Sequence, residues 1–312
     1  KIMSNILIIK HGSFGDIIQA NGAIEDIKNF YKDSKVLLLT TSPYTELMSQ
    51  CPYVDGVIID KRLPRWNLFY LSALKKLLAR YNFTHVFDLQ NSSRTKFYKK
   101  YILKNSIWSS TETILENDQS KSDFDKEPVL ERMEIQLKKS GINTKNIHKP
   151  NLSWALVDIN RVVKQHTSND YILIFPFCSK KHINKKWPLF KELVKEIKQT
   201  YNNKYSVLIA PGPGEIKEAN TFNAKVVLEN EKPINFNKLI TLINKSKYII
   251  SNDTGPAHVS SHLNKKGLVL FGSHTTPEKV SIENDNFRAI KALKISDIKV
   301  INVIKEVKKY LD

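Results

Sequence analysis

Short runs of consecutive apolar residues alternate, along the first half of the chain, with longer stretches in which apolar residues recur every three or four positions. The runs occupy residues 5–9, 35–40, 54–59 and 85–89. Continuous apolar runs are typical of strands in a parallel sheet that is buried on both faces, and the periodic stretches predict helices. We expect these helices over residues 17–31, 44–50, 68–81 and 128–140. The polar stretch 109–128 is predicted to be a loop.

The same pattern restarts at Tyr171. Further apolar runs lie at residues 171–175, 206–210, 225–228, 248–251 and 267–271. Helical spacing follows at residues 188–201, 236–245 and 297–310. The sequence therefore predicts an α/β protein made of two doubly wound units in series. The expected domains span residues 1–155 and 165–296, and a C-terminal helix over residues 297–312 is expected to pack back on the N-terminal domain.

The net charge of the chain is unusually high. Its 312 residues include 49 Lys or Arg and 31 Asp or Glu, for a formal charge of +18, and both halves of the chain are basic. This charge is consistent with nucleic acid, an anionic membrane surface or phosphate-bearing substrates, and equally with solvated surface lysines that have no ligand. A hydrophobic content of 41% excludes a wholly disordered chain.

Two cysteines, Cys51 and Cys178, lie far apart in the sequence. They form no metal-binding or redox pair and suit a reducing cytoplasm. No apolar run approaches the ~18–20 residues that a membrane span needs, and no signal peptide is expected. We therefore expect a cytoplasmic protein with at most peripheral membrane contact.

The segment that follows the first apolar run, residues 10–16, reads KHGSFGD. The carboxyl end of a strand is where open α/β sheets bind ligands, and glycines such as Gly12 and Gly15 let the backbone approach a ligand closely. Asp16 would lie at the start of the next helix. It is either a helix cap or a catalytic carboxylate at the mouth of a cleft.

A second strand-to-helix segment, residues 251–258, reads SNDTGPAH. Asp253 and Thr254 are suited to cap a helix, and Pro256 fits a first helical turn. The amides of this turn and the helix dipole favour an anion, of which polyphosphate is the natural example. The alternative is an ordinary capped helix.

Three more loops follow predicted strands of the second unit. Residues 179–188 carry a cluster of lysines that can neutralise a departing diphosphate, and residues 211–215 end in Glu215, which can accept hydrogen bonds from ribose hydroxyls. Residues 271–277 form another loop of small and polar residues. Each loop alone also reads as a solvated turn, but parallel strands place all of them at one edge of a sheet.

Together these motifs resemble the bacterial heptosyltransferases, glycosyltransferase family nine, over residues 5–311. The resemblance implies the GT-B architecture, with two Rossmann-like domains that face a central cleft: an N-terminal acceptor-binding domain and a C-terminal domain that binds the nucleotide-sugar. It also implies an inverting, metal-independent transfer of a sugar, typically heptose from ADP-heptose, to the lipopolysaccharide core or a related phosphorylated glycan. No cofactor is implied, and we expect a monomer at the inner face of the inner membrane.

The resemblance also assigns roles to residues. Asp16 maps to the general base, and Lys185 maps to a contact with the diphosphate. The donor-binding residues implied are Ser179, Glu215, Asp253, Thr254, Gly255, Pro256 and His258. The acceptor-binding residues implied are Gly12, Ser13, Gly15, Lys61, Arg62 and Arg65.

Two positions depart from the family pattern. Asn91 stands where the family usually has glycine in the sequence D-L-Q-G, and the loop 271–277 is one residue longer than the family's F-G-P-T-x-P. Other functions also remain open. They are a sugar-nucleotide epimerase or hydrolase of the same fold, a family member that binds without catalysis, and a nucleic-acid-binding protein, which the charge alone suggests.

Overall fold

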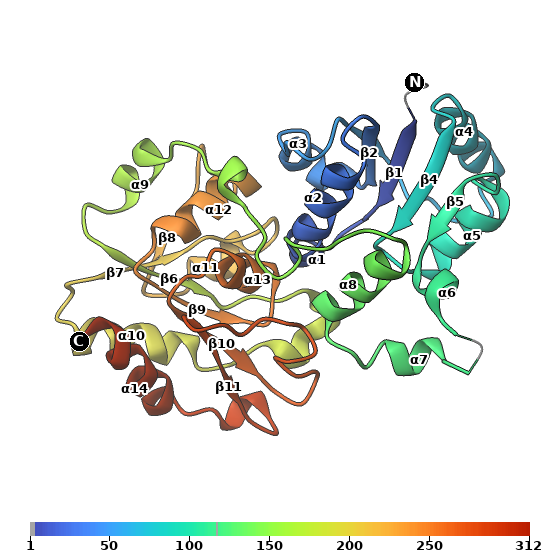
Figure 1. The fold of residues 1–312 in the computed structure, drawn as a ribbon. Coiled ribbons are helices and arrows are strands. Elements are labelled where there is room, and N and C mark those ends of the chain that lie inside the picture. The colour runs from blue at the N-terminus through green and yellow to red at the C-terminus, as the bar shows by residue number, and fades with distance from the viewer. Residues whose placement is uncertain (1–3, 117) are drawn as a thin grey trace. The chain divides into compact units, whose positions relative to one another are not determined.

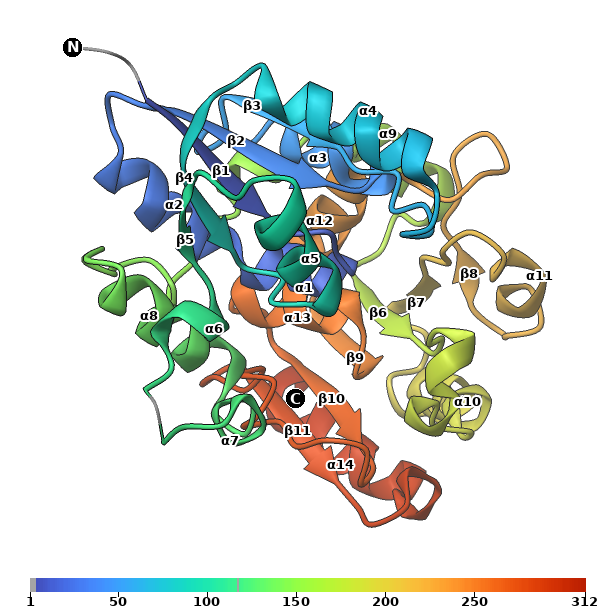
Figure 2. The same ribbon diagram turned by 90° about the vertical axis from the view of Figure 1, so that its right-hand side faces the viewer.

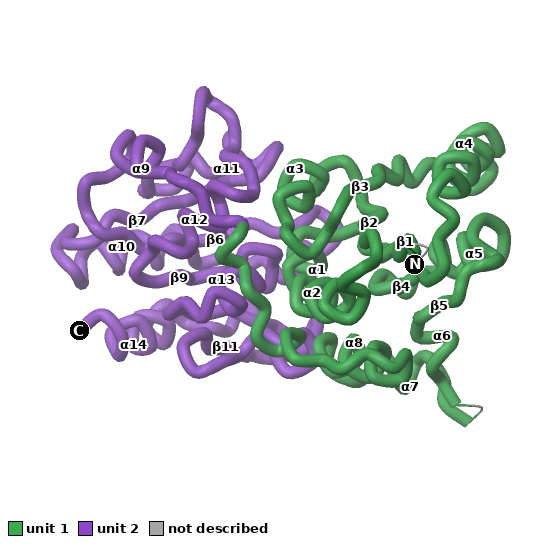
Figure 3. Tube along the Cα trace, turned by 45° about the horizontal axis from the view of Figure 1, so that its top comes forward, with its two compact units in different colours: residues 1–154 green, residues 155–312 purple. Residues whose placement is uncertain are grey.

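The computed structural model describes residues 4–116 and 118–312. The chain divides after Trp154 into two compact units, residues 1–154 and residues 155–312, which are shown in different colours in Figure 3. Each unit contains one sheet in which every pair of neighbouring strands is parallel. The predicted α/β class and its two-unit organisation are confirmed.

The first unit contains a five-stranded sheet in the order β3-β2-β1-β4-β5 (Figure 1). Its strands are β1 (Asn5–Ile9), β2 (Lys35–Thr40), β3 (Gly56–Ile59), β4 (Phe83–Asp88) and β5 (Ile107–Ser109). Its helices are α1 (Phe14–Gln19), α2 (Asn21–Phe30), α3 (Thr45–Met48), α4 (Leu68–Ala79), α5 (Ser93–Tyr101), α6 (Thr111–Ile114), α7 (Lys121–Phe124) and α8 (Val129–Lys139). A short 3-10 turn, η1 (Ser42–Tyr44), precedes α3.

Both faces of this sheet are covered. Leu7 and Ile9 of β1 belong to a buried cluster that includes Leu74 and Leu78 of α4 and Tyr98 of α5. The intervening residues of β1 point to the other face and are also fully buried, on the side where α2 lies in Figure 1. This double burial explains why the strands read as continuous apolar runs.

Some local expectations for this unit were wrong. The predicted helix 17–31 is two helices: α1 begins at Phe14 and ends at Gln19, and α2 starts at Asn21 after the shared cap residue Ala20. The stretch 109–128 was predicted as a loop but contains α6 and α7. Each of these helices has four residues and a serine at its N-cap, so neither is long enough to show helical periodicity.

The second unit contains a six-stranded sheet in the order β11-β10-β9-β6-β7-β8. Its strands are β6 (Tyr171–Phe175), β7 (Ser206–Ile209), β8 (Lys225–Val226), β9 (Tyr248–Asn252), β10 (Gly267–Phe271) and β11 (Phe287–Lys291). Its α-helices are α9 (Asn160–His166), α10 (Phe190–Thr200), α11 (Ile216–Ala219), α12 (Phe236–Lys245), α13 (Gly255–His262) and α14 (Val300–Leu311). Its 3-10 turns are η2 (Ser153–Ala155), which begins just before the boundary, η3 (Lys180–Lys185) and η4 (Ile295–Asp297).

The C-terminal helix α14 packs within the second unit. It contacts α10 and β10, and its buried residues Val303, Ile304 and Val307 belong to the hydrophobic core of that unit. The segment 297–312, which was expected to pack back on the N-terminal domain, thus covers one face of the second sheet. Its apolar stripe is buried there against α10 and β10 of the same unit.

Each sheet reverses its strand order once. In the first unit the chain proceeds from β1 to β2 and β3 on one side, and then returns to place β4 and β5 on the other. In the second unit the reversal lies between β6 and β9. The loops after the two central strands diverge at such a point and leave a crevice, which is where open α/β sheets bind ligands. The loops after β1, β4, β6 and β9 are therefore the places to look for a site.

No helix within the described residues 4–116 and 118–312 is long and apolar enough to cross a membrane.

Candidate functional site

The loop after β1 leads directly into α1 and carries Asp16. Ser13 is the N-cap of α1, and its N–H and Oγ–H groups donate to Oδ2 of Asp16 at 2.7 and 2.9 Å. Nζ of Lys10 lies 3.6 Å from Oδ1 of Asp16. The side chain of Asp16 is nevertheless 42% exposed. Asp16 therefore completes the helix cap and still presents its carboxylate to solvent at the crevice.

Two glycines shape this loop. Gly12 has a φ of +121°, and a Cβ atom there would lie 2.4 Å from Cε2 of Tyr44. Only glycine fits both the backbone conformation and the space. Gly15 is buried in the first turn of α1, whereas Ser13 is exposed. The loop thus brings main chain, rather than bulky side chains, to the crevice.

A pocket of about 140 Å³ lies beside Asp16, where the loops after β1 and β4 meet. Nζ of Lys10 donates to the carbonyl of Leu89 at 3.0 Å, and N–H of His11 donates to Oε1 of Gln90 at 2.9 Å. These bonds join the two loops across the reversal of strand order. The pocket is lined by Lys10, Asp16, Leu89, Gln90, Asn91, Thr111, Val129, Arg132, Met133 and Gln136.

Asn91 explains one departure from the family pattern. Its φ is +49°, in the left-handed region that favours glycine and tolerates asparagine. Its Oδ1 accepts the N–H of Thr111 at 2.7 Å, and its Nδ2 donates to Oε1 of Gln136 at 2.9 Å. Asparagine thus keeps the backbone conformation that glycine would have and adds two bonds to the wall of the pocket.

Asp60 is a buried carboxylate directly after β3. Its Oδ2 lies 2.8 Å from Nε2 of His11 and accepts the hydroxyl of Tyr98 at 2.7 Å. Its Oδ1 accepts the hydroxyl of Tyr70 and the N–H of Arg62, the latter at 2.8 Å. Burial alone would raise the pKa of Asp60, but these donors overcome it and lower the pKa to about 2. Asp60 thus ties the loop after β1 to the basic stretch after β3.

The three cations of that basic stretch, Lys61, Arg62 and Arg65, are all exposed. Arg62 has a φ of +49°, and Arg65 is held by a hydrogen bond of 3.4 Å to the carbonyl of Ser93. The Arg65 guanidinium also lies 5.9 Å from the centre of the Phe97 ring. The three predicted acceptor cations therefore lie in an exposed loop that is anchored to the buried Asp60 network.

In the second unit, Asp253 directly follows β9 and is buried. Its Oδ2 lies 2.6 Å from Nζ of Lys185, which comes from η3 after β6, and 3.1 Å from Nε2 of His274. Its Oδ1 lies 3.8 Å from Nε2 of His258. Burial would raise the pKa of Asp253, but the cation and the imidazoles hold it below its usual range. Lys185, His258 and Asp253, all singled out from the sequence, are brought together.

His274 was missed as a site residue. It lies in the loop after β10 that is one residue longer than the family pattern, and its ring stacks on Phe271 with an interplanar angle of 10°. Burial lowers the pKa of His274 despite the neighbouring Asp253. The unusual length of the loop was visible in the sequence, but the direction of the imidazole toward Asp253 was not.

The N-terminus of α13 lies directly after Asp253. Thr254 is its N-cap, and Gly255 and Pro256 form its first positions. The first N–H groups of a helix have no partner within the helix and carry a partial positive charge. Trp187 anchors the lysine loop nearby, because its N–H donates to Oδ1 of Asn252 at 3.0 Å and its buried Nε1 donates to the carbonyl of Ile298 at 2.9 Å.

Two predicted donor residues have local roles. Ser179 is exposed at the N-cap of η3, and its carbonyl accepts the N–H of His182 at 2.8 Å. Oε2 of Glu215 accepts the N–H of Gly212 at 2.7 Å and closes the turn after β7. Burial raises the pKa of Glu215. Both residues lie at the carboxyl edge of the sheet, where the sequence predicted them.

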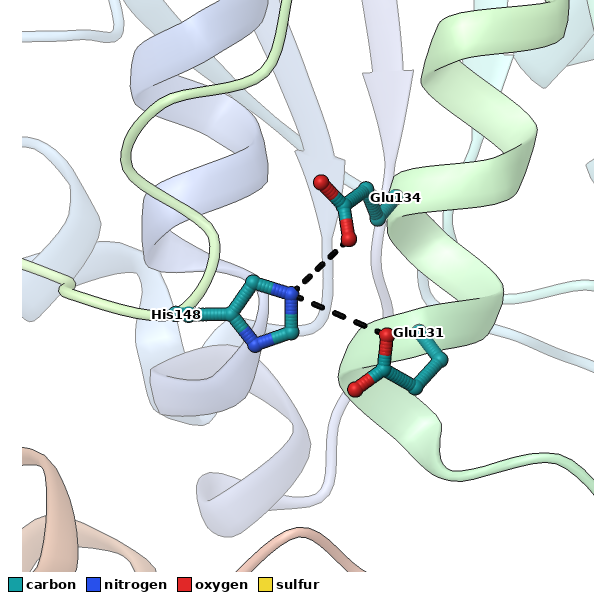
Figure 4. Close-up of side chains that lie close together, drawn as sticks. All are labelled: Glu131, Glu134 and His148. Carbon is teal, nitrogen blue, oxygen red and sulfur yellow. Dashed lines mark hydrogen bonds and ion pairs between the residues drawn. The ribbon is translucent and has the colours of Figure 1, made fainter.

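Glu131, Glu134 and His148 form a group of possible metal ligands (Figure 4). Nε2 of His148 lies 3.0 Å from Glu134 and 3.9 Å from Glu131. Glu134 also pairs with Lys138 at 2.7 Å and accepts a hydrogen bond from Thr144, and these donors lower its pKa to about 2. We interpret the group as a surface ion-pair cluster, because Glu134 is already neutralised.

Comparisons with known proteins are consistent with this geometry. The sequence model of glycosyltransferase family 9 (heptosyltransferase) matches residues 71–307. Lipopolysaccharide heptosyltransferase 1 of Campylobacter coli is 22% identical over 300 residues, which cover 86% of this chain and 84% of that protein.

Solved structures show the same fold. The E. coli heptosyltransferase WaaC with ADP gives a TM-score of 0.72 at 16% identity, over 98% of this chain and 99% of that chain. A glycosyl transferase family 9 protein from Veillonella parvula gives a TM-score of 0.77 at 15% identity, over 99% of this chain and 97% of that chain. The expected GT-B architecture is thereby confirmed.

The Asp60 network predicts a specific pH dependence of stability. Because the pKa of Asp60 is about 2 in the folded protein and about 3.9 when unfolded, its contribution is present above pH ~4 and is lost as the pH falls toward 2, by about 2 kcal/mol. Urea unfolding across this range should show that loss in the wild type. The loss should be smaller in Tyr98→Phe, which removes one donor to Asp60. The exposed Asp118→Asn variant is the control, and a Tyr98→Phe profile parallel to the wild type would contradict the assignment.

Proposed function

The chain belongs to glycosyltransferase family 9, the heptosyltransferases, and from this premise we propose that it transfers a heptose from ADP-heptose to the lipopolysaccharide core or a related phosphorylated glycan. The observation that carries the proposal is the group formed by Lys185, Asp253 and His274 at the N-terminus of α13. A fixed cation beside free helical N–H groups is suited to a nucleoside diphosphate.

The donor would bind with its diphosphate between Lys185 and the first turn of α13. Asp253 does not bind the anion itself. It fixes the ammonium of Lys185 at 2.6 Å, which offsets its negative charge, and lies 3.1 Å from Nε2 of His274. We propose that Thr254 and Gly255 contribute main-chain N–H groups, and that Glu215 lies toward the ribose.

The acceptor would bind in the first unit, at the pocket beside Asp16. Lys10 and Arg132 supply positive charge to the pocket walls, and Lys61, Arg62 and Arg65 supply it outside. These groups suit an acceptor that carries phosphates or acidic sugars.

We propose that Asp16 acts as the general base. As the acceptor oxygen attacks the anomeric carbon, its proton passes to the Asp16 carboxylate, and the bond between that carbon and the phosphate oxygen breaks. The attack comes from the face opposite the leaving group, so the configuration inverts. Lys185 and the N–H groups of α13 stabilise the charge that develops on the departing diphosphate, and this stabilisation takes the place of a metal ion.

A ligand panel followed by a transfer assay tests the donor and the reaction. We expect ADP-heptose to raise the melting temperature more than UDP- or GDP-sugars, because binding stabilises the folded state. ADP release should require a phosphorylated glycan acceptor. Equal release without any acceptor would instead identify a hydrolase or epimerase of the same fold, and a response to UDP- or GDP-sugars alone would overturn the donor assignment.

Asp16→Asn should abolish transfer with little effect on donor binding. The amide can still accept the N–H of Ser13 but cannot take a proton, so kcat should fall by about 10²–10⁴-fold. The donor Kd, measured by calorimetry, should stay within about twofold, since the donor residues lie in the other unit. Glu46→Gln, an exposed first-turn acid of α3, is the matched control. Retention of most activity by Asp16→Asn would remove Asp16 as the base.

Lys185→Ala should weaken donor binding by about 10- to 100-fold, which corresponds to the loss of one charge-assisted hydrogen bond. Lys186→Ala is a matched control, because the neighbouring lysine pairs with the exposed Glu218 rather than with Asp253. Calorimetry with ADP measures both, after thermal melts confirm that the variants are folded. Equal affinities of the two variants would place the diphosphate elsewhere.

A further inference from the structure

Large apolar side chains are concentrated on the surface of one short segment, which we call the 59–69 patch. Eleven large hydrophobic side chains are exposed among the described residues, and five of them lie within residues 59–69. Trp66 is 80% exposed, Leu68 73% and Phe69 92%. The other two are Ile59 and Leu63. A contiguous group of this kind normally marks an interaction surface.

The same region is strongly basic. Residues 61–112 contain eleven Lys or Arg and two acids, the buried Asp88 and Glu112, which pairs with Lys96 and Lys99. Lys61, Arg62 and Arg65 alternate with the apolar side chains of the patch. The carboxylate nearest in sequence, Asp60, is buried and already bound to His11 and Tyr98. The cations of the patch therefore face solvent without an acidic neighbour within the segment.

The patch rests on a rigid base that keeps its apolar side chains outside the core. Oδ1 of the buried Asp60 accepts the N–H of Arg62. The guanidinium of Arg65 donates to the carbonyl of Ser93 and lies over the ring of Phe97, both in α5. The side chain of Asn67 accepts the N–H of Tyr70 and caps α4.

Beyond this cap, α4 lies along one face of the first sheet (Figure 2). It buries Leu74 and Leu78 there and leaves Leu68, Phe69 and the lysines at 75 and 76 exposed. The fold thus presents the apolar residues outward.

We propose that the 59–69 patch docks the protein on an anionic lipid bilayer. Trp66, Leu68 and Phe69 enter the boundary between headgroups and acyl chains, and the three cations contact lipid phosphates. Tryptophan is suited to this boundary because its ring is apolar and its N–H is polar. Binding needs neither donor nor glycan acceptor, so the inference does not depend on the proposed function.

Other occupants fit the patch less well. A second copy of the chain would bring two strongly basic surfaces together, which electrostatic repulsion opposes. RNA would satisfy the cations and could stack on Trp66 and Phe69, but the three aliphatic side chains of the patch, Ile59, Leu63 and Leu68, offer it neither a stacking surface nor hydrogen bonds. A bilayer with acidic headgroups complements both the charge and the apolar area.

Vesicle sedimentation tests the proposal. The wild type should bind phosphatidylcholine vesicles that contain about one-third phosphatidylglycerol, and should bind pure phosphatidylcholine at least about tenfold less. The double variant L68S/F69S should lose about tenfold or more of the binding to anionic vesicles. The control L293S/I301S removes apolar side chains that are 79% and 64% exposed in the second unit and should bind as the wild type does. The fluorescence of Trp66 should shift to shorter wavelength on binding, and W66F should lose that shift.

Undiminished vesicle binding by L68S/F69S would overturn the proposal, as would equal binding to both kinds of vesicle. A patch-dependent dimer in sedimentation velocity, or patch-dependent RNA binding without vesicle binding, would also overturn it. Transfer to a water-soluble acceptor separates this inference from the proposed function. L68S/F69S should transfer at the wild-type rate there, whereas failure of the wild type in that assay contradicts the function and leaves the vesicle result intact.

Discussion

Three aspartates are buried at the carboxyl ends of parallel strands, and the loops of both units are organised around them. A carboxyl group removed from water destabilises the fold by several kcal/mol unless donors surround it, so each aspartate requires a particular arrangement of the chain nearby. Asp60 draws in His11 and two tyrosines, and Asp253 draws in Lys185 and His274. Asp88, whose pKa is raised by burial, accepts the N–H groups of the two residues at 90 and 91.

The two units share a topology but carry different chemical groups at the point where the strand order reverses. Each places its candidate site where the strand order reverses, because the loops after the central strands diverge there. In the first unit the crevice has an exposed carboxylate, Asp16, beside a buried lysine. In the second it has a cation held at a helix N-terminus. The base proposed in one unit and the anion site proposed in the other match the division that a transfer between two bound substrates needs.

The basic surface has an uneven distribution that the whole-chain charge conceals. In the 59–69 patch, three cations precede the exposed Trp66, Leu68 and Phe69, and the buried Asp60 accepts the N–H of Arg62. The same buried carboxylate also contacts His11, next to the loop that carries Asp16. The surface suited to a bilayer and the loop suited to an acceptor are thus both attached to the buried Asp60 network. This shared support would keep the distance between them constant while a substrate is held at the lipid surface.

The sequence by itself determined the α/β class, the two units and most strands, because strands buried on both faces are apolar throughout and need no knowledge of their partners. It also indicated which loops to examine for a site, since Asp16, Lys185 and Asp253 all follow apolar runs. Only the tertiary structure decided which of these residues meet. The contact of Asp253 with Lys185 joins residues from different strands, and His274 reaches the same carboxylate from a third loop. The sequence also did not predict that Leu68 and Phe69 are exposed, because helical spacing alone does not tell which apolar residues of α4 face the sheet.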